Sequence, residues 1–597
     1  LEKRSEDRYQ SATGLVRDLE EMRAEAAKGN SLADMQLARW DMSGQFQVSQ
    51  KIYGRDKEIQ LLLESFDHMT QGRAELLLVG GYSGIGKTSL VNEVHKGLTR
   101  QRGRYISGKH DQFQRDIPFS AFIQAFRQLV NQILSEPEAR VIHWRTTLLK
   151  ALGNNAQVMV DVIPELELLL GGQPPVPELG PSEAQNRFIL CIQRFIGVFA
   201  RREHPLVIFL DDLQWADAPS LQLLWTLASQ ALTPYLLLLG AYRDNEVFPG
   251  HPLLLTVKRL LDSGTAVRTV SLTPLGNADL RLLVADTLRR PLDEVGELTR
   301  LIEEKTGGNP FFVSQMLKEL HARGVFRLAP ETGGWLWDMA GIRAMELTDN
   351  VVDLMAGRIG RMDSRTRQAL TLAACIGNRF ELSVLAAVRE QSVAEAGESL
   401  WEALRTGLLL PAGSTFRFLH DRVQQAAYSL IPQADLAPLH LRIGRLLLRH
   451  VGQTQLDEAI FDVVSHFNAA LDLIADPDER MALFDLNMRA GRKAKASTAY
   501  EPALRHFDIA ASLLPEDAWR TQPDVMLDVA REKADVSYLL GDFAQAEGLL
   551  DEALAQTRDR FEKVEIFIQK LIQYNQLGKY NEMIDRARDA LALFGVM

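Results

Sequence analysis

The residues with the clearest chemistry form a glycine-rich loop after an apolar run, LLLVGGYSGIGKTSL (76–90). Gly81, Gly86, Lys87 and Thr88 fit the P-loop pattern G-x4-G-K-[ST]. Glycines let backbone N–H groups turn toward phosphate oxygens, and the helix expected from Lys87 directs its positive end at the same anion. We expect Lys87 to reach the β- and γ-phosphates and Thr88 to bind Mg²⁺. The predicted phosphate-binding residues are Gly81, Ser83, Gly84, Gly86, Lys87, Thr88 and Ser89. The alternative is a glycine-rich turn without a ligand.

Two carboxylates follow the apolar segment PLVIFLDD (205–212). Asp211 is expected to hold Mg²⁺ through its water shell, and Asp212 to orient or deprotonate an attacking water. Arg243 follows another apolar segment, YLLLLGAY (235–242), where an arginine can sense the γ-phosphate. The alternatives are a strand-end cap for the two acids and a surface role for the arginine. Lys87, Asp212 and Arg243 are the candidate catalytic residues, with Thr88 and Asp211 as metal ligands.

Alternating strand and helix patterns surround these motifs. ELLLVG (75–80), RYISGK (104–109) and the two apolar segments above are strand candidates separated by helical stretches. Such an arrangement is typical of a buried parallel sheet. After 250 the strand signals thin out: 251–345 reads as mainly helical, with a hairpin around GVFRLAPETGGWLW. Residues 346–435 give short helices and a second hairpin, GLLLPAGSTFRFLH, a mixture that suits a winged helix.

The C-terminal part, from about 436 to 597, is helical throughout and contains a repeat. Tyr500, Phe543 and Tyr580 are each expected to begin a helix, at spacings of 43 and 37 residues. An alanine stands ten residues after each aromatic, which lets paired helices approach closely. This pattern is similar to tetratricopeptide-type hairpins. The first two units also have an alanine three residues after the aromatic, whereas the third has Met583 at that position. A generic helical array is the alternative.

Composition restricts the classes that remain. The 597 residues carry a formal net charge of −11, so no bulk attraction to nucleic acid or anionic membrane is expected. The two cysteines argue against a disulfide framework and fit a reducing compartment, so we expect a cytoplasmic protein. No apolar run is long enough to span a bilayer. The chain begins LEKRSEDRYQ, without Met or a signal-peptide pattern, and is expected to be a piece of a longer protein.

Five segments together carry a family resemblance. They are YGRDKEIQLL, GGYSGIGKTSL, LVIFLDDLQWAD, LLLLGAYRDNEV and KTGGNPFFVSQML. They resemble the AAA-type, origin-recognition-like ATPase module of STAND signalling proteins. The similarity is closest to long bacterial hybrids that join a Ser/Thr protein kinase, this ATPase, helical repeats, a GAF domain and a histidine kinase. The start, KRSEDRYQSATGLVRDLEEM, resembles the last helix of the kinase domain in such hybrids.

The resemblance implies a multidomain chain. It comprises a kinase-like end and linker (1–48), an α/β P-loop NTPase core with a parallel sheet (49–250), an all-α helical lid (251–345), a winged helix (346–435) and a TPR-like α-solenoid (436–597). No HRD, DFG or kinase glycine loop with its strand lysine occurs, and HDQ (110–112) and HDR (420–422) lack that context. Kinase activity is therefore expected only of a parent protein.

Four further ligand-binding residues are expected. Gly54 and Arg55, in IYGRDKE before the first helix of the core, could bring backbone close to adenine; the alternative is a turn before a helix. The resemblance implies that Pro310, in GGNPFF, lies against the adenine, and that His420 touches the β-phosphate of bound ADP. Pro310 could equally begin a helix, and His420 could be a helix-start or core histidine.

The expected function is an ATP-binding, slowly hydrolysing signalling switch that uses ATP/ADP and Mg²⁺. A protein or peptide is expected on the repeats, with ATP-dependent self-association and no specific nucleic acid. One alternative is a nucleotide-binding scaffold without turnover. The other is a STAND-type transcription regulator, although such proteins usually carry a C-terminal helix-turn-helix, whereas this sequence ends in repeats.

Overall fold

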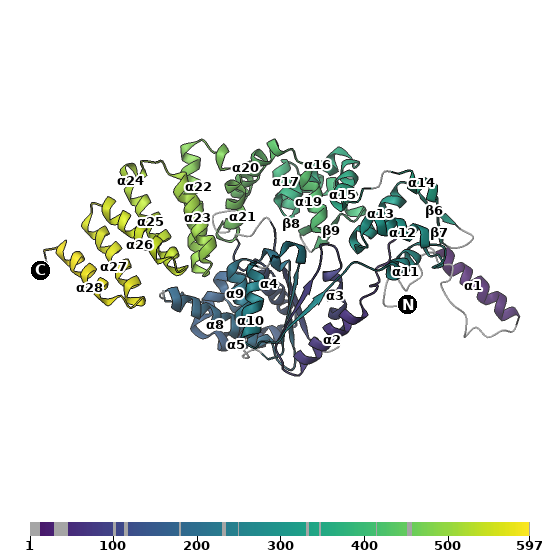
Figure 1. The fold of residues 1–597 in the computed structure, drawn as a ribbon, viewed down its shortest axis with the longest axis horizontal. Helices are drawn as coiled ribbons and strands as arrows, with labels where there is room; N and C mark the ends of the chain where they lie inside the picture. Colours follow the sequence, from purple (N-terminus) through teal and green to yellow (C-terminus); the bar gives the residue numbers. More distant parts are fainter. Residues whose placement is uncertain are drawn as a thin grey trace.

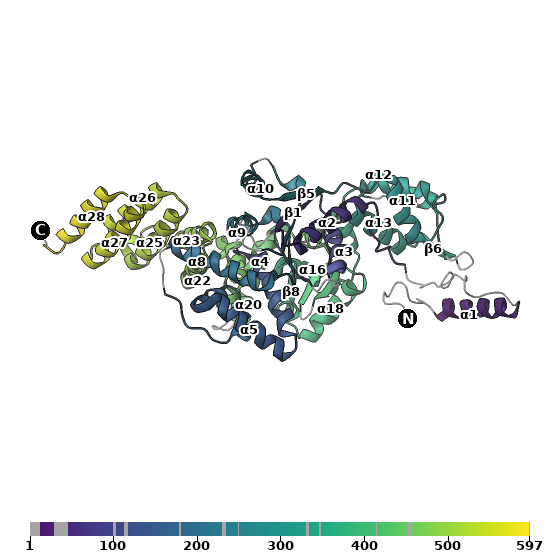
Figure 2. The ribbon, with the colours of Figure 1, turned by 90° about the horizontal axis from the view of Figure 1, so that it is seen from below.

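The computed structural model describes residues 12–28, 46–98, 103–112, 117–177, 181–229, 234–248, 250–329, 334–345, 348–412, 415–450 and 456–595. A central sheet domain lies beneath an arch of helices, with α11–α13 at one end and α25–α28 at the other (Figures 1 and 2). None of the helices in this described part is both long and apolar enough to cross a membrane. In the segment expected to be the end of a kinase-like domain, the structure describes α1 (Ala12–Ala27) and Lys28; residues 1–11 and 29–45 lie outside the described residues, and the kinase-like assignment stays a prediction.

The sheet domain is built on five parallel strands in the order β2-β3-β4-β1-β5. Their bounds are β1 Glu75–Gly80, β2 Arg104–Lys109, β3 Leu206–Asp211, β4 Leu236–Tyr242 and β5 Val267–Ser271. The first four confirm the strands expected from sequence. Residues 251–345 were expected to be mainly helical with one hairpin, and the all-α description of this segment was wrong at β5, whose sequence VRTVS has only two apolar residues. The sheet therefore continues beyond the predicted boundary at 250.

Helices cover both faces of this sheet (Figure 1). Successive side chains of β1 point to opposite faces: Leu77 and Val79 pack with α2 and α3, and Leu76 and Leu78 join the core formed with α4, α8 and α9. The helices are α2 Asp56–Thr70, α3 Lys87–Leu98, α4 Ser120–Leu134, α5 Glu138–Leu152, α6 Ala156–Val162, α7 Leu166–Leu170, α8 Pro181–Phe199, α9 Ala218–Ser229 and α10 Pro252–Asp262.

The next two segments share one hydrophobic core. The first contains α11 Asn277–Leu288, α12 Gly296–Thr306, α13 Pro310–Ala322, the hairpin β6 Phe326–Ala329 with β7 Gly334–Trp337, and α14 Met339–Arg343. The second, here named the β8–β10 domain, contains α15 Val351–Gly360, α16 Ser364–Ile376, β8 Arg379–Glu381, α17 Leu382–Arg389, α18 Val393–Arg405, β9 Leu409–Ala412, β10 Thr415–Phe418 and α19 Asp421–Ser429. Both expected hairpins are confirmed. The winged-helix assignment stays a prediction.

Paired helices form the C-terminal part, and Tyr500, Phe543 and Tyr580 begin α23, α26 and α28 as expected. Close packing uses small residues: a Cβ on Gly491 of α22 would lie 2.5 Å from the Phe507 ring of α23. The helices are α20 Gln433–His450, α21 Leu456–Asn468, α22 Pro477–Ala496, α23 Tyr500–Leu513, α24 Ala518–Thr521, α25 Pro523–Leu539, α26 Phe543–Gln556, α27 Arg560–Gln576 and α28 Tyr580–Ala592. Their tetratricopeptide character stays a prediction.

Candidate nucleotide site

The glycine-rich loop connects the carboxyl end of β1 to the first turn of α3. Gly84 and Gly86 have φ values of +80° and +102°, which L side chains rarely adopt. A Cβ on Gly86 would meet nothing within 4 Å, so the backbone there borders open space. The Ser83 hydroxyl oxygen is buried and has no hydrogen-bond partner among the residues that the structure describes. Ser89 is exposed on α3. An open, glycine-lined loop at a helix N-terminus fits a phosphate.

Lys87, the first residue of α3, lies inside this loop. The side chain is 7% exposed, and its ammonium donates to the carbonyl oxygens of Gly81 (2.7 Å) and Tyr82 (3.0 Å). Burial lowers the pKa of Lys87, and the nearby carboxylate of Asp211 acts in the opposite direction. Two uncharged carbonyl oxygens therefore hold the ammonium at the loop. Negatively charged phosphate oxygens could take their place as stronger hydrogen-bond acceptors.

The two expected metal ligands lie together. The Thr88 hydroxyl donates to Asp211 Oδ2 at 3.0 Å, across 123 positions of sequence. Burial, and then the Asp212 carboxylate, raise the pKa of Asp211 to about 6. Mg²⁺ takes oxygen ligands and usually keeps several waters beside one or two carboxylates and substrate phosphates. The hydroxyl and carboxylate pair therefore fits this ion.

Asp212 and Arg243 form a buried ion pair at the same edge of the sheet. Asp212 has left-handed backbone angles (φ 56°, ψ 46°), and its Oδ1 accepts from Arg243 Nε at 3.1 Å and from Gln214 Nε2 at 2.8 Å. The Arg243 guanidinium also lies 4.3 Å from the ring centre of Trp215 and donates to Glu246 at 2.9 Å. Burial lowers the pKa of Arg243, but Asp212 and other carboxylates raise it above its usual value. Arg243 is thus a fixed cation beside the expected water-orienting carboxylate.

A carboxylate from the β8–β10 domain completes this cluster, and sequence reasoning missed it. Asp421 Oδ2 accepts from Arg243 Nη2 at 2.6 Å, and Asp421 Oδ1 accepts from Lys109 Nζ and from Asn378 Nδ2. Lys109 Nζ also lies 3.2 Å from Asp212 Oδ2. Lys109 ends β2 as Asp211 ends β3, and ligand-binding residues commonly follow the carboxyl ends of parallel strands. The position of Lys109 at the end of a strand was therefore a sequence signal that could have identified it as a site residue.

The GGNPFF segment contacts the loop directly. Asn309 Nδ2 donates to Ser83 O at 2.8 Å, and the Phe311 backbone N–H donates to Gly84 O at 3.2 Å. The His420 ring stacks on Phe311 with ring centres 4.2 Å apart. A cavity of about 440 Å³ lies here, within the usual size of small-molecule pockets (about 300–1,000 Å³). It is lined by Tyr82, Ser83, Asn245, Thr306, Asn309, Phe312, Asp349, Asn350, Val351, Val352 and Arg422.

Pro310 and His420 both occupy helix starts. Pro310 is the first residue of α13, which Asn309 caps, and His420 Nδ1 accepts from the Arg422 backbone N–H (3.1 Å) at the start of α19. The helix-start interpretation is therefore confirmed for both. Burial lowers the pKa of His420 to about 4. Contact of these residues with adenine or a β-phosphate stays a prediction.

Gly54 and Arg55 lie where the expected adenine-binding residues meet. The Arg55 guanidinium donates to the backbone carbonyl oxygen of Thr273, and Gly54 (φ +61°) lies beside the Asp279 carboxylate. Both partners belong to the segment 273–279, which follows β5. Gly308 accepts a backbone hydrogen bond from the same segment at 3.0 Å. The structure thus brings the turn at Gly54 and the loop before Pro310 to one segment. The turn before α2 is confirmed, and an adenine contact stays a prediction.

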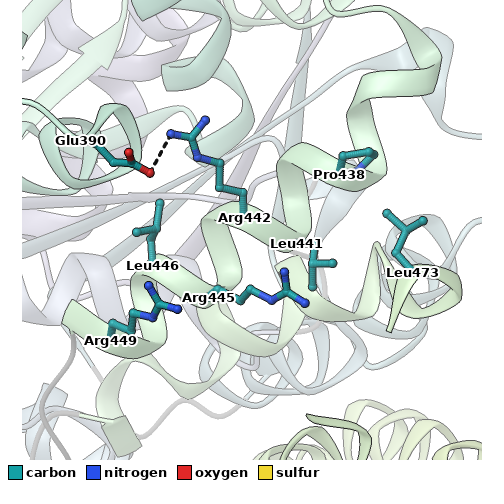
Figure 3. A pocket seen from close by; sticks show the side chains of 8 residues that line it. All are labelled: Glu390, Pro438, Leu441, Arg442, Arg445, Leu446, Arg449 and Leu473. Carbon is teal, nitrogen blue, oxygen red and sulfur yellow. Dashed lines mark hydrogen bonds and ion pairs between the residues drawn. The ribbon is translucent and has the colours of Figure 1, made fainter. Parts of the chain in front are cut away.

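A second pocket, lined mainly by α20 together with Glu390 after α17 and Leu473, is a weaker candidate (Figure 3). It has a volume of about 290 Å³ and contains three arginines among apolar side chains. Arg442 donates to Glu390 at 3.1 Å, and Arg445 forms two hydrogen bonds with Glu479 at 2.7 Å. Because Arg442 and Arg445 already have acidic partners and half of the lining side chains are apolar, this pocket lacks the chemistry of the loop site.

Comparison with known proteins agrees with this location. Residues 51–239 match the family model of the AAA ATPase domain. Hybrid signal transduction histidine kinase G of Dictyostelium discoideum is 28% identical over the whole of this chain and 21% of its own length. Peroxide stress-activated histidine kinase mak3 of Schizosaccharomyces pombe is 20% identical over 86% of this chain and 25% of its own length. This chain thus corresponds to about a quarter or less of the length of each of these relatives.

Among solved structures, a STAND protein with a tetratricopeptide repeat sensor from Pyrococcus horikoshii is similar with a TM-score of 0.40 and 14% identity. The similarity covers 94% of this chain and 79% of that one. The AAA ATPase match includes the glycine-rich loop, Thr88 and both carboxylates after β3. The segment that matches the AAA ATPase domain model therefore contains the loop and the carboxylates that the geometry brings to the carboxyl edge of this sheet.

Proposed function

We propose that this chain is an ATP-dependent switch within a signalling protein. The observation that carries the proposal is the ion pair between Arg243 of the sheet domain and Asp421 of the β8–β10 domain, 2.6 Å apart. It joins the domain that contains the phosphate loop to a domain distant in sequence, at the position where a γ-phosphate sensor is expected. A ligand that competes for Arg243 would therefore alter how the two domains are held.

The binding chemistry follows from the loop. Backbone N–H groups of 81–88 and the N-terminus of α3 would surround the phosphates, and the Lys87 ammonium would exchange its two carbonyl acceptors for phosphate oxygens. Thr88 and Asp211 would hold Mg²⁺. When bound, Mg²⁺ would neutralise charge that develops on the phosphate oxygens.

Asp212 would orient the attacking water, but in this arrangement both of its carboxylate oxygens face cations. A carboxylate whose two oxygens are both engaged by Lys109 and Arg243 has little freedom to bind water. The closed arrangement should therefore hydrolyse ATP slowly. This supports a switch over a rapidly cycling enzyme.

Switching requires the two nucleotides to prefer different arrangements, because a ligand shifts an equilibrium only by its differential affinity. We propose that ADP favours the closed arrangement, in which Asp421 binds Arg243. We propose that the γ-phosphate of ATP takes Asp421's place and favours an open arrangement. Phe311 links this event to the loop, since its backbone donates to Gly84 and its ring stacks on His420.

The wider role follows from the histidine kinases to which the chain is similar, and it remains part of the proposal. The chain would be a regulatory module of a kinase hybrid, with a protein or peptide bound to the α20–α28 array. In such a role, ATP binding would promote self-association. No specific nucleic acid is expected as a partner.

Phosphate release from the purified chain, compared with that from Asp212→Asn, tests turnover. The switch predicts slow release by the wild-type chain and a further loss of about 10²-fold or more in the variant. Equal background rates would favour a nucleotide-binding scaffold that does not hydrolyse ATP. Solution mass with ADP and with a non-hydrolysable ATP analogue tests the switch itself, and the same mass in both would contradict ATP-dependent self-association.

A further inference from the structure

Lys109 occupies a place equivalent to that of Arg243 on the other side of β3. The strand order β2-β3-β4 puts the ends of these strands side by side, and Lys109 is the direct register partner of Asp211. Arg243 follows β4. One cation therefore flanks the carboxylates of β3 on each side, whereas the sequence drew attention to Arg243 alone.

The two cations share the same two carboxylates. Lys109 lies 3.2 Å from Asp212 Oδ2 and donates to Asp421 Oδ1. Arg243 lies 3.1 Å from Asp212 Oδ1 and 2.6 Å from Asp421 Oδ2. Each cation thus takes one oxygen of each carboxylate, and the four formal charges sum to zero. Asp421 therefore binds Lys109 as well as Arg243.

Opening the domains would break this balance. If Asp421 leaves, Lys109 keeps Asp212, and Arg243 keeps Asp212 and Glu246, so each cation loses one carboxylate partner and the charge around them becomes more positive by one. The Arg243 side chain is 5% exposed and that of Lys109 37% exposed, so water can solvate the pair only in part. A partly buried cation that loses its partner carries a desolvation cost until another anion replaces the carboxylate. The anion expected beside Thr88 and Asp211 is the terminal phosphate of ATP.

We propose that Lys109 is a second binding group for the terminal phosphate of ATP, and that this phosphate and the Asp421 carboxylate compete for Lys109 and Arg243 together. The inference rests on the proposed function and extends it, because it makes Lys109 a determinant of the preference for ATP over ADP. ADP lacks the phosphate that would replace Asp421, so its binding leaves both cations on the carboxylate.

The charge states support this competition. Burial opposes the charged form of Lys109, but Asp421 and Asp212 raise the pKa of Lys109 above its usual value. Burial likewise opposes the charged form of Asp421, yet Lys109 and Arg243 hold the pKa of Asp421 below its usual range. Lys109 and Asp421 are therefore both charged at neutral pH. The competition requires this, because the Asp421 carboxylate and the phosphate must both be anions that bind the same cations.

The test compares ADP with a non-hydrolysable ATP analogue, each with Mg²⁺, by calorimetry. Lys109 contacts Asp421 as well as the proposed phosphate position, so Lys109→Gln is made in the Asp421→Asn background, where the carboxylate is already gone. We expect the added substitution to weaken binding of the ATP analogue by about 10-fold to 100-fold, the effect of losing a charge-assisted hydrogen bond. ADP affinity should change by less than about threefold, which also shows that the loop is intact.

Lys109→Arg in the same background should retain most of the preference for the ATP analogue, because it keeps a cation at this position. Lys495→Gln is the matched control: this lysine also contacts two carboxylates, Glu532 and Asp535, but lies between α22 and α25. Unchanged affinity for the ATP analogue in Lys109→Gln/Asp421→Asn, relative to Asp421→Asn, would overturn the inference while leaving the switch intact. Absence of binding by either nucleotide to the wild-type chain would instead overturn the proposed function.

Discussion

Asp421→Asn should release the β8–β10 domain from the nucleotide site. The substitution keeps the size of the side chain and one acceptor oxygen but removes the charge that Arg243 and Lys109 share. Asn378 also donates to Asp421, at 2.6 Å, but both residues belong to the β8–β10 domain, so that bond exists whether the domains are closed or open. Only the bonds to Arg243 and Lys109 change the balance between the two arrangements.

The magnitude follows from burial. A hydrogen bond to a charged group contributes about 1.5–3 kcal/mol, and the Arg243 side chain, 5% exposed, should approach this range. The Lys109 side chain is 37% exposed, so its bond is discounted to about 0–1 kcal/mol for solvent screening. The closed arrangement should therefore lose about 1.5–4 kcal/mol relative to the open one. At 1.36 kcal/mol per tenfold change, the closed-to-open ratio falls by about 10-fold to 900-fold.

A stopped-flow chase of a fluorescent ADP analogue measures this change, because ADP must leave through the open arrangement. Asp421→Asn should release ADP faster by about the factor above. Asp435→Asn, which changes an exposed carboxylate at the start of α20, should stay within about twofold of wild type. Release at the wild-type rate by a normally folded Asp421→Asn protein would refute the reasoning.

Two further predictions concern stability. Gly491→Ala should destabilise the α22–α23 pair by about 1–3 kcal/mol, because the new methyl group would lie 2.5 Å from the Phe507 ring. Gly548→Ala, inside α26 with nothing within 4 Å, should instead stabilise by about 0.5–1 kcal/mol; thermal melts of the two variants with the same sign would contradict this account of the helix packing. Burial, followed by the neighbouring His440, lowers the pKa of His466 to about 3, so the unfolded chain binds the extra proton first as pH falls below about 6.5. The free energy of unfolding should therefore fall from pH 6.5 toward pH 4, by up to about 1.4 kcal/mol per pH unit for this group, and the melting temperature should fall with it. A His466→Gln variant with the wild-type slope would show that the group does not contribute.

The parts of the molecule that sequence predicted well depend on local pattern. Three of the expected strands, β1, β3 and β4, are continuous apolar runs between helices, and β2 was expected from RYISGK. The loop, Thr88 and Asp211 meet because β1 and β3 end at the same carboxyl edge of a parallel sheet, with β4 between them. The fifth strand, β5, was missed because VRTVS has no continuous apolar run and lies after 250, where the strand signals thin out.

The residues that sequence missed depend on contacts between distant segments. Lys109 and Asp421 are 312 positions apart, and Asp421 and Arg243 are 178 positions apart. Asp421 stands one residue after His420, at the start of a helix, where an acidic residue is ordinary because it favours the helix dipole. Only the packing of the β8–β10 domain against the sheet edge distinguishes it from any other helix-start acid.

Calorimetric titration of the wild-type chain and of Lys87→Ala with Mg²⁺ and ATP tests the central claim most directly. Among the described residues, Lys87 donates only to carbonyls of its own loop, so its replacement removes the phosphate-binding cation while leaving the ion pairs of Arg243 in place. The site described here predicts a saturable heat of binding for the wild-type chain and for Lys258→Ala, a change of an exposed lysine on α10, and none for Lys87→Ala. The same ATP affinity in Lys87→Ala as in wild type would contradict the assignment of the nucleotide site.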